Sequence, residues 1–350
     1  MTENIYRNLR EFLDKLPGGF PETPTGVEIK LLKKLFSPEQ AELAVELRRE
    51  PEECSAIAAR TGISEDILSE RLEEMARKGL IFRTRKGDRP LYNAEQFIIG
   101  IYEFQAMNKD PEFYDLFEQY LPYLGLSLSG VKTPMMRYIP IESALTPETE
   151  IATYDRVRDL ISGESVIAVQ QCICKQTQGF QGNECPKPQE VCFGFGEFAQ
   201  FIIDNGMGRE ITRDEAFAIL KRAEDEGLVL GLPNAQKLSF LCCCCSCCCP
   251  NLRFSKRAER PVDMVFSNHR AEIDPELCTS CDVCVERCQM EAILADGATT
   301  EILEGRCIGC GLCVSSCPED AITLKVKEGV EAPPKDFKEV FDRVASERGL

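Results

Sequence analysis

Eight cysteines in the last quarter of the chain repeat one spacing twice. The pattern Cys-x2-Cys-x2-Cys-x3-Cys occurs at Cys278, Cys281, Cys284 and Cys288, and again at Cys307, Cys310, Cys313 and Cys317. An iron–sulfur cubane needs four thiolates that converge on one small object, and this spacing is a compact way to supply them. Zinc ligands and structural disulfides are the alternatives, but two full runs in register favour clusters.

This stretch resembles bacterial-type two-[4Fe–4S] ferredoxin domains. Pro318 follows the second run as the motif expects, whereas Gln289 takes the place of proline after the first. Ala292-Ile293 and Ala321-Ile322 follow the two runs at matching places, which indicates a duplicated unit. In the bacterial arrangement the fourth cysteine of each run binds the other cluster. The resemblance therefore implies one cluster on Cys278, Cys281, Cys284 and Cys317, and one on Cys307, Cys310, Cys313 and Cys288.

The middle of the chain carries a second, less regular set of cysteines. Cys172 and Cys174 follow a predicted buried strand at 166–170, and Cys185 and Cys192 follow a polar loop. Four such thiolates could close on a further iron–sulfur cluster or on zinc. Gly194 and Gly196 would allow close backbone approach and N–H···S hydrogen bonds to a cluster.

Seven of the eight residues from Cys242 to Cys249 are cysteines. Adjacent side chains of an extended segment point to opposite faces, so the run could offer alternate thiolates to two metal centres. It could also hold one unusual cluster with an open coordination site, which would be a catalytic centre. The candidate ligands in this run are Cys242, Cys244, Cys245, Cys247 and Cys248. We expect two [4Fe–4S] clusters in the carboxyl-terminal domain and one or two further clusters in the middle, with zinc as the rival.

The composition places these cysteines in a reducing compartment. The chain has 350 residues, 20 cysteines and a net charge of −17. We find no secretory signal pattern and no apolar run of the ~18 to 20 residues that a membrane span needs. We therefore expect a cytoplasmic protein, and clusters on this scale suggest an anaerobe. The acidic charge argues against bulk phosphate binding and suits docking on a basic protein partner.

Residues 27–95 resemble a winged helix-turn-helix domain. A helix at 56–61 meets a glycine turn at Gly62, Ser64 begins the next helix, and two strands flank Lys86-Gly87-Asp88. The helix that would enter the major groove carries five acids, Glu65, Asp66, Glu70, Glu73 and Glu74, which phosphates repel. We therefore expect a docking or scaffolding module and no nucleic-acid partner. The lone Cys54 is interpreted as a small buried side chain.

Together these patterns predict an α+β multidomain protein. The predicted parts are an amino-terminal helix and linker (1–26), the winged-helix-like domain (27–95), a helical connector of two helices split at Asp110-Pro111 (96–132), an α/β cysteine-rich iron–sulfur domain (133–252), a ferredoxin-like 2[4Fe–4S] domain (253–330) and a carboxyl-terminal helix (331–350). This order resembles a poorly characterised group of 4Fe-4S binding proteins from anaerobic bacteria. The resemblance implies electron transfer. The run at 242–249 is denser in cysteine than that group leads one to expect, so its ligand set stays open.

Three functions follow from these observations. The first is a multi-cluster protein that passes single electrons between a low-potential donor and a partner oxidoreductase. The second is an oxidoreductase in which a middle cluster reduces a substrate. The third is a redox-sensing winged-helix regulator. The first is favoured over a stand-alone enzyme, and the oligomeric state, including a dimer through the amino-terminal domain, is left open. His269, the only histidine, is a remote candidate ligand.

Overall fold

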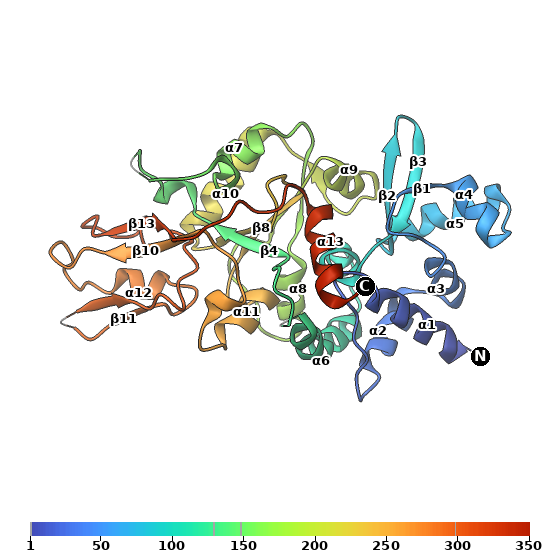
Figure 1. The fold of residues 1–350 in the computed structure, drawn as a ribbon, viewed down its shortest axis with the longest axis horizontal. Coiled ribbons are helices and arrows are strands. Elements are labelled where there is room, and N and C mark those ends of the chain that lie inside the picture. Colours follow the sequence, from blue (N-terminus) through green and yellow to red (C-terminus); the bar gives the residue numbers. More distant parts are fainter. Residues whose placement is uncertain (1, 129, 148, 298) are drawn as a thin grey trace.

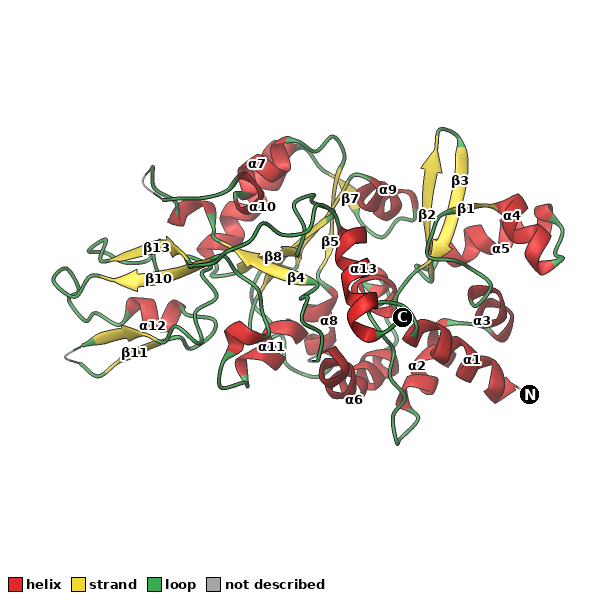
Figure 2. Cartoon of the chain, viewed as in Figure 1, coloured by secondary structure: helices red, strands yellow, loops and turns green. Residues whose placement is uncertain are grey.

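The chain forms a row of three regions, seen from end to end in Figure 1. The computed structural model describes residues 2–128, 130–147, 149–297 and 299–350. Helices gather in the amino-terminal region and around a central sheet, whereas the far end consists mostly of short strands and loops (Figure 2). The fold is thus mixed α and β, with small sheets. Among the described residues, no helix is both long and apolar enough to cross a membrane.

The amino-terminal region contains five helices and a small antiparallel sheet in the order β1-β3-β2. These elements are α1 (Thr2–Asp14), α2 (Val27–Leu35), α3 (Pro38–Ala44), β1 (Glu52–Glu53), α4 (Cys54–Thr61), α5 (Glu65–Arg77), β2 (Ile81–Lys86) and β3 (Arg89–Ala94). Ser37 and Gln40 form a capping box at the start of α3. Gly62 ends α4 at a φ of 73°, a conformation that favours glycine. The predicted helix boundaries around Gly62 are confirmed.

The connector differs from the two predicted helices. Residues Phe97–Ile101 form an irregular turn with extended backbone at Ile98 and Ile99, and Glu103–Gln105 form a single 3₁₀ turn. Side chains here compete for the backbone: Gln96 donates to the Ile99 carbonyl, and Glu103 accepts from the Gly100 N–H at 2.7 Å. Only the second predicted helix forms, as α6 (Pro111–Leu128).

The central region is built on a six-stranded sheet in the order β4-β8-β9-β6-β5-β7, in which every neighbouring pair is antiparallel. Its strands are β4 (Met136–Ile139), β5 (Ile167–Gln171), β6 (Glu190–Phe195), β7 (Arg209–Glu210), β8 (Val229–Pro233) and β9 (Phe240–Cys244). Its helices are α7 (Val157–Ser162), α8 (Ile173–Phe180), α9 (Glu197–Asp204), α10 (Arg213–Asp225) and α11 (Pro250–Lys256). Strands β6 and β9 and the end of β5 carry cysteines, and the pairing of these strands places those cysteines close together.

The far end of the molecule has the approximate symmetry of a duplicated unit. Two antiparallel pairs form there, β10 (His269–Ile273) with β13 (Ile322–Val326) and β11 (Ile293–Ala295) with β12 (Thr300–Ile302), together with α12 (Val283–Arg287). The chain then returns along the molecule to α13 (Phe337–Arg348), beside the amino-terminal helices (Figure 1). There Arg348 donates to the Leu16 carbonyl at 2.6 Å and pairs with Asp14 at 3.1 Å.

Two hydrophobic cores hold these regions together. The first joins α1 to α6 with residues of the central region, among them Ala168, Ile173 and Phe201. The second joins the central sheet with the carboxyl-terminal strands, through residues such as Val229, Leu312 and Ile322. Because each core crosses a boundary between regions, the central sheet is held from both sides.

Candidate metal centres

The carboxyl-terminal cysteines line two small cavities. The first is lined by Cys278, Cys281, Cys284 and Cys317, and the second by Cys288, Cys307, Cys310 and Cys313. The fourth cysteine of each run therefore lies with the first three of the other run. This is the crossed arrangement that the spacing implied.

Backbone N–H groups point at several of these sulfurs. The Ala292 N–H donates to Cys288 Sγ at 3.2 Å, and the Ala321 N–H donates to Cys317 Sγ at 3.3 Å. The two alanines stand at the matching places of the duplicated unit, so the repeat has a structural reason. The Ala271 N–H donates to Cys307 Sγ at 3.4 Å. Such bonds stabilise negative charge on sulfur and raise a cluster's potential.

Burial makes these thiols poor anions unless a cation is near. Burial raises the pKa of Cys310 to about 12, and it raises the pKa of Cys313 well above the ordinary thiol value. Iron binds cysteine as thiolate, and its own charge compensates for the lost hydration. An all-thiolate donor set around a small cavity therefore fits an iron–sulfur cluster.

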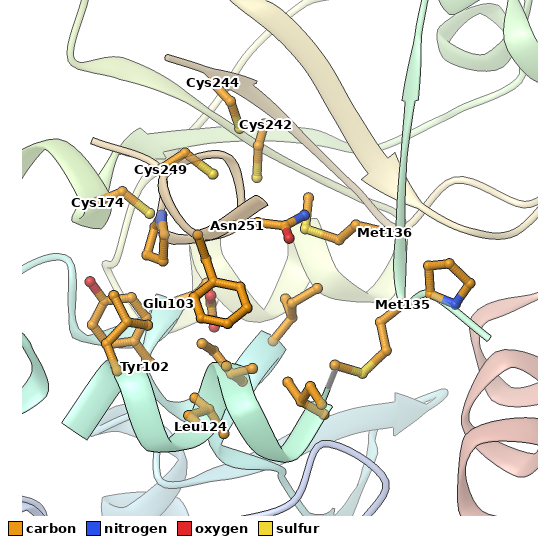
Figure 3. Close-up of a pocket in the computed structure, with 18 of the residues that line it drawn as sticks. Tyr102, Glu103, Leu124, Met135, Met136, Cys174, Cys242, Cys244, Cys249 and Asn251 are labelled. Carbon is orange, nitrogen blue, oxygen red and sulfur yellow. The ribbon is translucent and has the colours of Figure 1, made fainter. Parts of the chain in front are cut away.

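Six cysteines of the central region form a second group, which we call the six-cysteine group: Cys172, Cys174, Cys192, Cys242, Cys244 and Cys249. Cys192 lies opposite Cys242 across the β6–β9 pair. The thiols of Cys174 and Cys192 lower the pKa of Cys172, and the thiols of Cys192 and Cys244 lower the pKa of Cys242, which shows that these side chains lie close together. The side chains of Cys174, Cys242, Cys244 and Cys249 lie around one space (Figure 3).

Four other cysteines form a third group, which we call the four-cysteine group: Cys185, Cys245, Cys247 and Cys248. Their sulfurs all lie within 4.8 Å of one another. Cys185 Sγ is 3.9 Å from both Cys245 Sγ and Cys247 Sγ, and Cys247 and Cys248 are 3.6 Å apart. A single tetrahedral ion with metal–sulfur bonds of about 2.3 Å separates its sulfurs by roughly 3.8 Å. A cubane places each thiolate on a different iron and spreads them farther apart.

The run at 242–249 therefore contributes cysteines to two groups, which is one of the two arrangements considered for it in the sequence. Strand alternation explains the first part, because Cys242 and Cys244 share one face of β9 while Cys243 turns to the other. Burial raises the pKa of the Cys243 thiol. Beyond Cys244 the chain leaves the strand and turns, so alternation no longer applies. The turn brings Cys249 into the six-cysteine group, and the sequence analysis missed this residue.

Lys175 lies buried close to both groups. Its Nζ donates to the Pro188 carbonyl at 2.7 Å, and the side chain interacts electrostatically with Cys172, Cys192 and Cys245. Burial lowers the pKa of Lys175, but the thiols offset this and the pKa is raised overall. The charged ammonium partly balances the negative charge that thiolates bring into the interior. The sequence pattern did not single out Lys175 as a site residue, and only its position next to Cys174 pointed to it.

The structure shows the surroundings of four further residues that the sequence analysis singled out. Gly196 donates its N–H to the Val166 carbonyl at 3.0 Å, not to a sulfur. A Cβ at Gly194 would meet Ile202 at 2.7 Å, so this glycine is required for packing against α9. His269 lies in β10 with its ring 3.3 Å from the Glu150 carbonyl. Cys54 is half-buried rather than buried, and its Sγ lies 3.7 Å from the Glu65 carbonyl.

Comparison with known proteins gives one family match. Residues 271–324 match the model of the 4Fe-4S dicluster domain. A search of curated proteins finds no match, and a search of solved structures finds none either. The dicluster match supports iron–sulfur cofactors in this chain, and the four-cysteine group is a further set of thiols that could hold a metal ion. The carboxyl-terminal region, residues 271–324, is a ferredoxin-like domain of the 4Fe-4S dicluster type.

Proposed function

We propose that this protein is a multi-cluster iron–sulfur electron-transfer protein that passes single electrons between a low-potential donor and a partner oxidoreductase. Two clusters are held by the crossed sets of the dicluster domain. One or two further centres are held by the six-cysteine and four-cysteine groups. The protein's contribution is to place these centres close together and to tune them through burial, charge and N–H···S bonds.

The observation that carries this proposal is a hydrogen-bonded bridge between the dicluster domain and the cysteine run. Gln289, the residue after Cys288, accepts from the Ser246 N–H at 2.9 Å and from the Ser246 hydroxyl at 3.0 Å. Ser246 stands between Cys245 and Cys247 of the four-cysteine group. The departure from the ferredoxin motif at Gln289 thus coincides with the point where two candidate centres meet.

Neighbouring contacts fix this bridge in place. Gln289 also donates to the Gly227 carbonyl at 2.7 Å. Arg287 donates to the Asp225 carbonyl at 2.8 Å and to the Glu224 carbonyl at 2.5 Å, at the end of α10. The loop after Cys288 is therefore attached to the central region by several bonds, which favours a fixed separation between centres.

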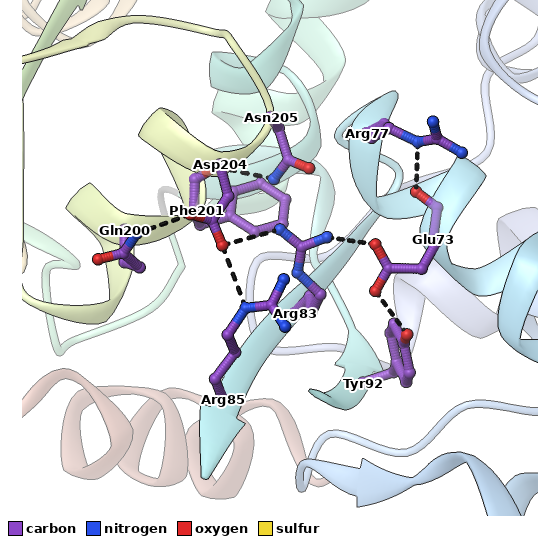
Figure 4. A network of polar contacts seen from close by, with 9 residues as sticks. All are labelled: Glu73, Arg77, Arg83, Arg85, Tyr92, Gln200, Phe201, Asp204 and Asn205. Atoms are coloured by element: carbon purple, nitrogen blue, oxygen red, sulfur yellow. Dashed lines mark hydrogen bonds and ion pairs between the residues drawn. The ribbon is translucent and has the colours of Figure 1, made fainter. Parts of the chain in front are cut away.

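We propose that the amino-terminal unit is a winged-helix-like module that acts as a scaffold. Its most buried basic residue, Arg83 of β2, pairs with Glu73 of α5 at 2.5 Å and with Asp204 of α9 at 3.2 Å (Figure 4). Arg85 pairs with Asp204 as well, at 3.2 Å. These arginines, which a DNA-binding wing would direct at phosphates, bind the central region instead.

The test of the relay is Gln289→Pro, which restores the residue expected in a ferredoxin motif. We expect unchanged iron content and a weakened magnetic interaction between the dicluster centres and a centre on the six-cysteine group in paramagnetic resonance spectra, because loss of the bridge to Ser246 loosens the attachment of the dicluster domain to the central region. Pro318→Gln is the matched control, since it makes the reciprocal change at the second run. Identical spectra for Gln289→Pro and the wild type would contradict the proposal.

The number of centres is measured by iron, zinc and acid-labile sulfide per chain on anaerobically purified protein. Roughly twelve to sixteen irons are expected for one or two centres beyond the dicluster pair. Roughly eight irons would overturn the relay. The short sulfur distances in the four-cysteine group favour a single ion there, so one zinc with about twelve irons would assign that group to zinc.

A further inference from the structure

A cavity of about 240 Å³ lies between the six-cysteine group and helix α6. Cysteines form one of its walls, and the opposite wall is apolar, with Leu121, Leu124, Met135 and Phe254 among its residues. Cys242, Cys244 and Cys249 lie at one end, and Leu124 and Met135 lie at the other (Figure 3). The cavity joins the candidate centre to a hydrocarbon-lined space.

This space extends beyond what thiol ligands can enclose. Its far wall is formed by α6, by residues 131–136 and by Val344 of α13, and none of these segments carries a cysteine. The 240 Å³ includes the part between the cysteines, where a cluster on the six-cysteine group would lie, so a further ligand is confined to the part next to α6. Exposed Asp263 also lines the cavity, so the cavity reaches the molecular surface near this residue.

The lining also contains a few polar side chains, among them Lys175, Glu103 and Asn251. Glu103 is enclosed by the protein but keeps accessible surface, because its carboxyl group faces the cavity. One of its oxygens accepts the Gly100 N–H at 2.7 Å. Asn251 lines the same cavity and donates to the Tyr138 hydroxyl at 3.1 Å. Few, fixed polar groups in an otherwise apolar cavity are the usual composition of a small-molecule site.

We propose that this cavity binds a small, uncharged, mainly apolar molecule with one hydrogen-bonding group, held between α6 and the six-cysteine group. The apolar wall contacts the hydrocarbon part, and Glu103 and Asn251 bind the polar group. The inference rests on the proposed function, because a molecule bound here would lie at the end of the electron path. It makes the central region a substrate site as well as a relay.

The test uses toluene and benzyl alcohol as probes, with binding to the anaerobically purified full chain measured by saturation-transfer NMR. The two probes are similar in size and differ in one hydroxyl group, which can donate to the Glu103 carboxylate. We expect both to bind, with benzyl alcohol about fivefold tighter for one net hydrogen bond. Glu103→Leu should remove this preference and retain toluene, and Glu103→Gln should preserve it.

Leu124→Trp fills the cavity and should abolish the binding of both probes. Leu126→Trp is the matched control, because Leu126 is on the same helix but 68% exposed. Absence of binding to the wild type, or binding that Leu124→Trp leaves unchanged, would overturn the inference. Iron per chain is measured on the same samples. Low iron overturns the relay whether or not the probes bind, whereas full iron without probe binding overturns the cavity site alone.

Discussion

At the scale of single residues, neighbouring cysteines have different surroundings. Cys243 and Cys249 are both buried, at 1% and 7% exposure, yet only Cys249 lies with the thiols of the six-cysteine group. The difference comes from the path of the backbone. Cys243 lies within β9, where its side chain points to the face opposite Cys242 and Cys244, whereas Cys249 lies after the turn, immediately before α11. Cysteine content alone does not identify ligands in such a run.

We predict that Cys249→Ala lowers iron content by about four atoms per chain, the content of one cubane. Cys243→Ala is the matched control and should leave the iron content unchanged. Iron analysis of the two variants, purified side by side, measures the difference. Equal loss in both variants would show that the run binds iron through a different set of thiols.

Lys175 should set the potential of the centre on the six-cysteine group. A unit charge about 8 Å from a centre, at an effective dielectric constant of about 20, changes its energy by about 2 kcal/mol. We predict that Lys175→Met lowers the reduction potential of the centre on the six-cysteine group by on the order of 100 mV. Redox titration followed by paramagnetic resonance measures this shift. Lys221→Met, at an exposed position, should leave the potential unchanged.

At the scale of elements, strand β2 is attached to the central helix α9 by a charged network. Arg83 is 4% exposed at its side chain and lies between Glu73 and Asp204 (Figure 4). The Tyr92 hydroxyl donates to Glu73 at 2.7 Å and completes the network. Removing the cation would leave two carboxylates close together in a partly buried site.

We therefore predict that Arg83→Met lowers the free energy of unfolding by about 3 kcal/mol, the usual cost of removing one partner of a buried pair. Arg89→Met is the control, because the Arg89–Glu53 pair is largely exposed, and its loss should cost less than about 1 kcal/mol. Denaturant unfolding of both variants measures the two values. Equal effects would show that the network adds no more than a surface pair.

Elements with local signals could be predicted from the sequence. The turn at Gly62 and the duplicated cysteine runs depend on residues close in sequence, and the structure has both. The irregular turn at 97–101 was missed because Gln96 binds the Gly18 N–H, a partner 78 residues away. The grouping of central cysteines was missed for the same reason, since it depends on the pairing of β6 with β9.

At the scale of the whole molecule, charge and packing both argue against a nucleic-acid partner. The chain carries a net charge of −17, and Arg83 and Arg85 of β2 both pair with Asp204. We predict no binding of a labelled DNA duplex in fluorescence anisotropy, even at about 50 mM salt, where phosphate contacts are strong. Salt-sensitive binding would instead support a regulator.

The different sequence ranges of the cysteine groups have a consequence for how the protein acquires its metals. Each carboxyl-terminal set comes from loops within 278–317, so a newly made domain could receive its clusters soon after synthesis. The six-cysteine group spans Cys172 to Cys249 and exists only after β5, β6 and β9 have paired. Long-range strand pairing is slow relative to local loop closure. We therefore expect metal loading to begin at the carboxyl-terminal sets and to end at the six-cysteine group, which would receive its metal only after the central sheet has folded.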